Sequence, residues 1–303
     1  MTVNMGVNIC GVEFKNPVIA ASGTFAFGRQ HSWFIDVNRL GGIALKSLTP
    51  EKRIGNKPPR IAESASGIIN SVGLQNPGVD KFIASTLKEV AQFKTVIIAN
   101  VAGGKIEDYV AVIEKLNETA IQMYELNISC PNVCEGGASF GTDTKRAAAC
   151  VTAARAAAKK PLIVKLTPAA GDIVSIAKAV WQAGADAISL INTLPAMAVD
   201  VRTKRPILGN VTGGLSGPCI KPVALKMVFD VSRAVGIPVI GMGGIMTGED
   251  AAEFMLCGAA AVMTGTANLI DPAASLRIID ELEAYAVGMK IKDISALTGA
   301  LEV

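Results

Sequence analysis

The stretch from Glu125 to Gly137 reads ELNISCPNVCEGG, and it continues an apolar run that begins at Ile121. The apolar run predicts a buried β-strand. The residues that follow it are two amides, a hydroxyl and a thiol: Asn127, Asn132, Ser129 and Cys130. A strand that ends in such a cluster is poor core material, but it suits the binding of a small polar molecule beside a reactive sulfur.

Seven more short apolar runs recur along the chain, and segments with helical periodicity separate most of them. The eight predicted strands are residues 17–21, 42–45, 95–100, 121–127, 162–166, 187–191, 238–241 and 260–264. The helical segments include residues 79–92, 106–117, 144–158, 173–183, 220–235 and 249–257. Apolar strands alternating with helices are typical of a parallel sheet covered on both faces. Eight units predict an α/β fold, a closed (β/α)8 TIM barrel, for which ~250 residues is typical. A doubly wound open sheet is the alternative, but no G-x-G-x-x-G follows the first strand.

Three segments extend this barrel. Residues 3–15 predict a small N-terminal β-hairpin. Residues 47–76 and 193–217 are too long for ordinary barrel connections, and long irregular loops are usually lids or binding loops. Both follow barrel strands, so we expect them at the C-terminal face, where barrel active sites lie. We expect residues 1–303 to form a single domain.

Composition excludes several classes of function. The net charge of the 303-residue chain is only +3, which does not favour nucleic acid as a partner. The chain has no run of 18 apolar residues and no basic start followed by an apolar stretch, so we expect neither a membrane span nor a secretory signal. The six cysteines lack paired spacing, which suits reduced thiols in the cytoplasm. A lone His31 and scattered cysteines predict no metal site.

The strand ends carry an unusual set of side chains: Ser22, Lys46, Ser47, Asn100, Asn127, Cys130, Lys165, Asn192 and Thr193. Alone, a strand-end lysine is a solvated charge and a strand-end asparagine is a turn residue or helix cap. Together they predict a site, because the barrel strands bring their ends to one face. Cys130 is the natural acid–base or nucleophile candidate, and nearby lysines could lower its pKa.

Glycines after the last two strands predict a phosphate site. Gly243-Gly244 and Gly265-Thr266 lie where backbone N–H groups can reach a phosphate, ahead of a helix that starts near Thr247. The alternative is that these glycines only make tight turns. Lys165 would lie opposite, where a buried cation could stabilise a reduced flavin ring, unless it pairs with a carboxylate such as Asp186. We expect His31 to be a surface or satisfied core histidine.

These motifs resemble those of the class 1 dihydroorotate dehydrogenases, flavin enzymes of pyrimidine biosynthesis. The matching segments are VIAASGTF (18–25), ALKSLT (44–49), IINSVGLQNPG (68–78), ELNISCPNV (125–133), VKLTP (164–168), INT (191–193), GGLSGP (213–218), GMGGI (241–245) and MTGTA (263–267). They cover nearly the whole chain in the family's order. The resemblance implies a (β/α)8 barrel with FMN at its C-terminal face.

The resemblance also implies residue roles. FMN would be held by Ala21, Ser22, Lys46, Ser47, Asn100, Asn127, Lys165, Ile191, Gly217, Gly243, Gly244, Gly265 and Thr266, the last four serving the phosphate. Dihydroorotate would be bound by Lys46, Asn70, Ser71, Val72, Gly73, Leu74, Asn127, Asn132, Asn192 and Thr193. Cys130 matches the family's catalytic base, and residues 131–141 would form a mobile flap.

Details of the motifs are similar to the NAD-linked class 1B catalytic subunits, which pass electrons to a partner subunit carrying FAD and a [2Fe–2S] cluster. The resemblance implies a homodimer core within a heterotetramer. The alternatives are a fumarate-linked class 1A enzyme, another flavin oxidoreductase acting on a pyrimidine ring, and, from a different class, a non-catalytic barrel that binds a phosphorylated ligand.

Overall fold

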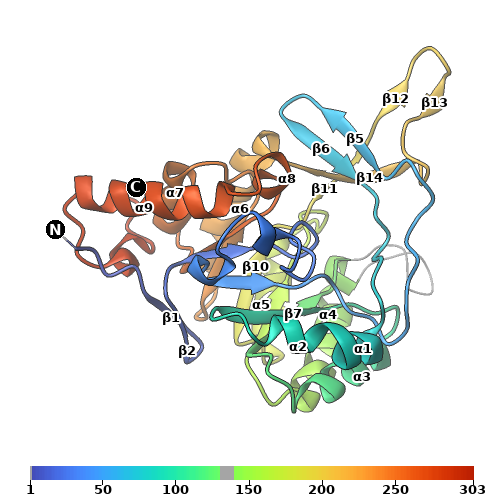
Figure 1. Cartoon of the computed structure of the whole chain (residues 1–303), viewed down its shortest axis with the longest axis horizontal. Helices are drawn as coiled ribbons and strands as arrows, with labels where there is room; N and C mark the ends of the chain where they lie inside the picture. Colours follow the sequence, from blue (N-terminus) through green and yellow to red (C-terminus); the bar gives the residue numbers. More distant parts are fainter. Residues whose placement is uncertain (1, 130–139) are drawn as a thin grey trace.

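Eight short parallel strands close into a barrel in the computed structural model, which describes residues 2–129 and 140–303 (Figure 1). The strands are β3 (Val18–Ala20), β4 (Gly42–Ala44), β7 (Val96–Val101), β8 (Met123–Asn127), β9 (Leu162–Lys165), β10 (Ala187–Leu190), β15 (Val239–Met242) and β16 (Ala261–Thr264). Pairing of β16 with β3 closes the circle. The predicted TIM barrel and its eight strands are confirmed.

Helices cover the outside of the barrel because both faces of each strand are apolar; all six residues of β7, for example, are buried. The longer helices are α3 (Ile106–Leu116), α4 (Thr144–Ala157), α5 (Ile173–Gln182), α6 (Lys221–Ser232), α7 (Gly248–Leu256) and α9 (Ala274–Gly288). The predicted helix at 79–92 is present in three parts, α1 (Val79–Lys81), a π-helical turn η3 (Phe82–Thr86) and α2 (Leu87–Val90). The short helices are α8 (Ala267–Ile270), η1 (His31–Trp33), η2 (Val37–Arg39), η4 (Phe140–Thr142), η5 (Pro218–Ile220) and η6 (Ile294–Leu297). In the described part of the chain, no helix combines the length and apolarity that a bilayer crossing requires.

The predicted N-terminal hairpin is confirmed as β1 (Val7–Ile9) and β2 (Val12–Phe14), which pair antiparallel. Its two turn residues, Cys10 and Gly11, both have positive φ, +54° and +82°. This is the conformation of a type I′ turn, whose twist matches that of the strands. The hairpin lies at the end of the barrel opposite the long insertions, since Cys10 Sγ donates to the carbonyl of Asp186, which precedes β10.

The two long insertions are not irregular throughout, as the sequence suggested, but pair with each other. They form a four-stranded antiparallel sheet in the order β11 (Leu194–Met197), β14 (Thr212–Ser216), β6 (Gly67–Asn70), β5 (Ile61–Ser64). The central pair joins segments that are distant in sequence, with Asn70 opposite Gly214. The sheet therefore connects the chain that leaves β4 with the chain that leaves β10.

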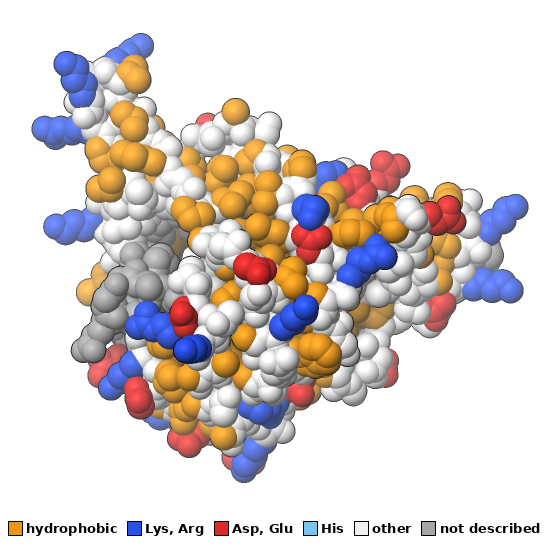
Figure 2. Space-filling model, turned by 180° about the vertical axis from the view of Figure 1, so that it is seen from behind, with side chains coloured by type: hydrophobic (Ala, Val, Ile, Leu, Met, Phe, Trp, Pro, Cys, Tyr) orange, Lys and Arg blue, Asp and Glu red, His pale blue; other side chains and the backbone are white. Residues whose placement is uncertain are grey.

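A small hairpin of β12 (Val199–Asp200) and β13 (Arg205–Pro206) extends beyond this sheet (Figure 1). Its tip is exposed and carries Arg202, Lys204 and Arg205 next to Val201, which is 82% exposed. Figure 2 shows basic side chains gathered on this projection, with apolar side chains beside them.

Candidate active site

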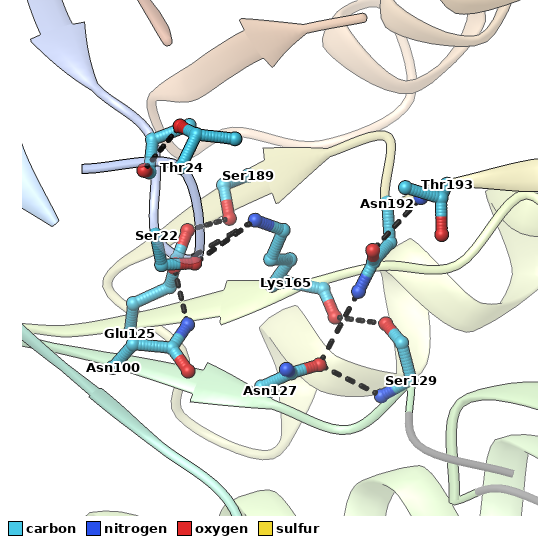
Figure 3. Close-up of polar contacts among 11 residues, drawn as sticks. Ser22, Thr24, Asn100, Glu125, Asn127, Ser129, Lys165, Ser189, Asn192 and Thr193 are labelled. Carbon is cyan, nitrogen blue, oxygen red and sulfur yellow. Dashed lines mark hydrogen bonds and ion pairs between the residues drawn. The ribbon is translucent and has the colours of Figure 1, made fainter. Parts of the chain in front are cut away.

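A buried carboxylate lies at the centre of the polar cluster at the strand ends. Glu125 of β8 has no exposed surface. Its carboxylate accepts hydrogen bonds from Asn100 Nδ2 at 2.5 Å, Ser189 Oγ at 2.8 Å and Ser22 Oγ at 3.3 Å (Figure 3). Lys165 Nζ lies 3.9 Å from the carboxylate and 3.4 Å from Ser22 Oγ. The four partners come from four different barrel segments, so the closed barrel is what assembles this cluster.

Lys165 is 5% exposed, and its carboxylate partner is Glu125 rather than Asp186. Asp186 precedes β10 at the opposite end of the barrel, where it pairs with Arg155. A second lysine, Lys46, belongs to the same site. Burial first and the charge of Lys165 second lower the pKa of Lys46, so the two ammonium groups interact. Among the described residues, the Lys46 ammonium has neither a hydrogen bond nor an ion pair. The site thus combines two cations with one carboxylate.

Asn100 contributes a buried acceptor atom without a partner among the described residues. Its amide nitrogen donates to Glu125, but its buried Oδ1 accepts no hydrogen bond from the described residues. A buried carbonyl oxygen without a donor is costly, so this atom is suited to a donor from a bound molecule. Ser47, also predicted for the site, is buried beside it, since the next residue, Leu48, donates its N–H to the Asn100 carbonyl at 2.8 Å.

A second polar group surrounds Asn127. The Asn127 Oδ1 accepts from Asn192 Nδ2 at 3.4 Å and from the Ser129 N–H at 3.3 Å. The N–H of Thr193 in turn donates to Asn192 Oδ1 at 2.8 Å (Figure 3). A hydrogen bond of 3.0 Å from Tyr109 to the Asn127 carbonyl fixes the end of β8. Three of the predicted substrate-binding residues, Asn127, Asn192 and Thr193, are therefore in one chain of contacts.

The insertion sheet brings Asn70 to this group. Asn70 Nδ2 donates to the Gly214 carbonyl at 3.4 Å. Gly214 packs so closely against Thr193 that a Cβ there would lie 1.9 Å from Thr193 Oγ1. Only glycine allows β14 to approach the strand end in this way.

The loop that follows Asn70 is held by the chain itself. Ser71 is buried, and its hydroxyl accepts from Asn56 Nδ2 at 2.9 Å. The Val72 carbonyl accepts from the Asn56 N–H, while Gly73 and Leu74 have positive φ, +76° and +54°. No contact described in the structure joins Val72, Gly73 or Leu74 to the Asn127 group, and Ser71 already uses its hydroxyl within the loop. The predicted role of these four residues stays a prediction.

The predicted cofactor glycines lie together. A Cβ at Gly244 would lie 2.9 Å from the Gly217 carbonyl, one at Gly243 would lie 3.4 Å from Ile191, and one at Gly217 would lie 3.6 Å from Thr266. Gly217, Gly243 and Gly244 have φ of +109°, +127° and +82°, values that favour glycine. Gly265, also predicted for this site, faces Ala21: a Cβ there would lie 3.9 Å from the Ala21 Cβ. Side chains of α6 and of the turn before it, those of Ala224, Lys221 and Ile220, pack against these glycines.

The helix expected to support a phosphate is already capped by the protein. Asp250 Oδ2 accepts from the N–H groups of Met246 and Thr247 at 2.8 and 2.9 Å, and Glu281 accepts from the Gly248 N–H at 2.7 Å. The N-terminus of α7 is therefore capped by two carboxylates and the Thr247 hydroxyl, and the two negative charges disfavour an anion there. Any phosphate here would bind to the glycine backbone itself.

Some sequence predictions fall outside what the structure describes. Cys130, Asn132 and Cys134 lie outside the described residues, as does most of the predicted flap at residues 131–141. His31 is partly buried and stacks on Phe25 with 3.7 Å between ring centroids. Its buried Nδ1 has no hydrogen-bond partner among the described residues, so the expectation of a surface or satisfied core histidine was wrong. Within the described residues, no cluster of His, Cys, Asp or Glu could hold a metal ion.

Sequence reasoning missed two site residues, Glu125 and Ser189. The signal was present for the first, because a glutamate within the apolar strand MYELN has to be paired or hydrogen-bonded when it is buried. Ser189 gave no signal, since a small hydroxyl inside a strand is common.

Comparison with known proteins agrees with this arrangement. The family model described as dihydroorotate dehydrogenase matches residues 4–285. A relative from Alkaliphilus metalliredigens, named "Dihydroorotate dehydrogenase B (NAD(+)), catalytic subunit", is 54% identical over 99% of both chains, and six more relatives at 50–54% identity carry the same name. A relative from Solibacter usitatus, 50% identical over the full length of both chains, is named for the fumarate-linked A type.

A solved structure shares the fold. The dihydroorotate dehydrogenase of Eimeria tenella, in complex with ferulenol, superimposes with a TM-score of 0.82 at 24% identity, covering 98% of this chain and 88% of that one. The chain therefore belongs to the dihydroorotate dehydrogenase family.

Proposed function

We propose that this chain is the catalytic subunit of an NAD-linked dihydroorotate dehydrogenase, which oxidises dihydroorotate to orotate in pyrimidine biosynthesis. The observation that carries the proposal is a set of polar contacts at one end of the closed barrel, which joins residues from five of its strand ends: Ser22, Asn100, Asn127, Lys165 and Asn192. Near-full-length relatives at 50–54% identity support the B-type assignment. We further propose that residues 1–303 act as one catalytic domain in the cytoplasm, without a nucleic acid or membrane partner.

FMN fits the residues at this site. The unpaired Asn100 Oδ1 offers an acceptor to a ring N–H, and Lys165 offers a cation next to it. The backbone N–H groups of Gly217, Gly243 and Gly244 would serve a phosphate, and the protein packs so closely around these residues that a Cβ has no room there. The predicted contacts from Ala21, Ser22, Lys46, Ser47, Asn127, Ile191, Gly265 and Thr266 belong to the same proposal. When bound, FMN supplies the acceptor for the hydride that leaves C6 of dihydroorotate.

The substrate would bind through charge and amide hydrogen bonds. Orotate carries a carboxylate and a ring of alternating amide donors and acceptors. Lys46 supplies a counter-charge that no described carboxylate already neutralises, and the amides of Asn70, Asn127 and Asn192 offer both donors and acceptors. Thr193, Asn132 and the backbone of residues 71–74 would complete the contacts.

Cys130 would act as the catalytic base that takes the proton from C5 of dihydroorotate. What supports this role is its place in the sequence, three residues after Asn127, which itself belongs to a site with two lysines. A neighbouring cation favours the thiolate, which is the form that can accept a proton. The activity of Cys130→Ala tests the role: we expect the variant to keep FMN and orotate binding but to lose most flavin reduction at neutral pH.

Two comparisons complete that test. Cys130→Ser should regain rate as pH rises, because a hydroxyl is a much weaker acid than a thiol. Cys257→Ala, on the outer side of the barrel at the end of α7, is the matched control and should reduce at the wild-type rate. Wild-type reduction in Cys130→Ala would remove this thiol from the mechanism.

The electrons would leave through a partner subunit that carries FAD and a [2Fe–2S] cluster, and two copies of this chain would form the core of a heterotetramer. The test is anaerobic reduction of the flavin by dihydroorotate, followed by addition of NAD or fumarate. Reoxidation by NAD only after addition of the partner supports the B type. Reoxidation by fumarate alone would support the A type, which the Solibacter relative keeps as the second candidate.

A further inference from the structure

We propose that Glu125 is a positioning residue of the redox site: it keeps Lys165 charged and fixed beside the bound flavin and thereby sets how the flavin potential depends on pH. The proposal rests on the proposed function, because it concerns the same FMN site. Glu125 is not among the residues assigned above to FMN, substrate or proton transfer.

The first support is geometric. Glu125 is fully buried, yet both carboxylate oxygens are used: Oε1 accepts from Ser189, while Oε2 accepts from Asn100 and Ser22 and faces Lys165 at 3.9 Å. Hydrogen bonds favour the charged form of a carboxyl group, and this one accepts three. It therefore presents a fixed negative charge to a lysine that is itself 5% exposed.

The second support is the balance of charge. Among the described residues, the charged groups that face Lys165 are Glu125 from β8 and Lys46 from the segment after β4. Two cations and one anion leave the site with one net positive charge. That charge suits an anionic substrate and a flavin that becomes more negative when reduced. Without Glu125, the buried Lys165 and the partly buried Lys46 would repel each other with no counter-charge between them, which favours loss of a proton.

The expected size of the effect follows from the distance. At 3.9 Å and an effective dielectric constant of about 20, loss of the opposite charge weakens proton binding by Lys165 by about a thousandfold. In Glu125→Gln, the lysine would thus be neutral next to oxidised flavin over part of the neutral pH range. It would take up a proton when two electrons arrive. In the wild type the Glu125 carboxylate faces the lysine in both flavin states, so no such proton uptake is expected.

The experiment is spectroscopic redox titration of the FMN-loaded protein against reference dyes from pH 6 to 9. At a fixed potential, the ratio of reduced to oxidised flavin rises as pH falls. For Glu125→Gln we expect this ratio to change by one further factor of ten per pH unit across part of this range. For a two-electron couple this is about 30 mV per pH unit added to the wild-type slope. The added slope should vanish in Glu125→Gln/Lys165→Met, which lacks the titrating group.

The matched control is Glu118→Gln, the same chemical change at an exposed glutamate that pairs with Lys159. Its slope should equal that of the wild type. A wild-type slope in Glu125→Gln as well would overturn the proposal. Because dyes drive the reduction, the titration remains interpretable even if dihydroorotate fails to reduce the wild type, a result that would overturn the proposed substrate alone.

A second measurement is independent of the flavin. Urea unfolding of the cofactor-free protein should show a double variant that is more stable than either Glu125→Gln or Lys165→Met, because each single change leaves one buried charge unpaired. If Glu125→Gln alone does not fold but the double variant does, the result would also support the pairing of the two charges. Losses that simply add, or a double variant no more stable than the weaker single variant, would count against the pair.

Discussion

Replacement of Gly244 by alanine should damage the space assigned to the cofactor phosphate. Gly244 has φ of +82°, a conformation that costs an L-residue about 1–2 kcal/mol. Its Cβ would also lie 2.8 Å from the Lys221 Cβ, 2.9 Å from the Gly217 carbonyl and 2.9 Å from the Lys221 nitrogen. Two of these atoms are backbone, so relief requires a shift of α6 or of the Gly217 turn. Overpacking of this kind costs about 1–3 kcal/mol.

The two contributions sum to about 2–5 kcal/mol. If the loop keeps its position, the loss reduces the free energy of unfolding of the cofactor-free protein. If the loop moves to relieve the contact, the loss reduces FMN affinity instead, and about 2 kcal/mol corresponds to about a thirtyfold rise in Kd. Urea unfolding measures the loss of unfolding free energy, and FMN fluorescence titration measures the loss of binding free energy. The sum of the two losses should be about 2–5 kcal/mol.

Gly288→Ala is the matched control. Gly288 is the last residue of α9, and a Cβ there would meet nothing within 4 Å. The change should stabilise the protein by about 0.5–1 kcal/mol through helix propensity and leave FMN affinity unchanged. A Gly244→Ala protein with unfolding free energy within about 0.5 kcal/mol of wild type and unchanged FMN affinity would refute the reasoning about this turn.

Three further changes test other parts of the site. Burial raises the pKa of Asp250, but hydrogen bonds from Lys221 and the loop N–H groups outweigh it and hold the pKa below its ordinary value. Asp250→Asn should therefore lower the free energy of unfolding by about 1–2 kcal/mol at pH 7. Urea unfolding should show this difference shrinking as pH falls below about 4. Because burial and Lys165 lower the pKa of Lys46, its charge destabilises the fold at neutral pH. Lys46→Met should raise the free energy of unfolding of the cofactor-free protein by about 1 kcal/mol at pH 7, and by less near pH 10. Calorimetry should show that the same variant binds orotate more weakly. Asn76 donates to Thr49 at 2.8 Å and to a loop carbonyl at 2.7 Å; Asn76→Ala should lower the free energy of unfolding by about 2–3 kcal/mol, and a loss under about 0.5 kcal/mol would show that the loop does not depend on it.

The barrel could be predicted from sequence because its strands are short, continuously apolar and separated by periodic helices. The gathering of Asn100, Asn127, Lys165 and Asn192 followed from topology alone, since parallel strands bring their carboxyl ends to one face. For the same reason, a position at or just after the end of a barrel strand was sufficient to place each of these four residues at the site.

The rest depended on partners that sequence does not display. The pairing of β6 with β14 joins segments whose apolar alternation is broken by glycines such as Gly213 and Gly214, so they read as loops. The choice of Glu125 over Asp186 as the partner of Lys165 depends on which end of the barrel each carboxylate occupies. The capping of α7 by Glu281 depends on how α9 packs against it.

The pairing of the two insertions also bears on the order of folding. Asn70 and Gly214 are 144 residues apart, so their contact requires closure of a very long loop of chain. Neighbouring barrel strands such as β7, β8 and β9 are much closer in sequence, and contacts of low separation form faster. The part of the site that depends on Asn70 should therefore mature after the part built on the ends of β7, β8 and β9.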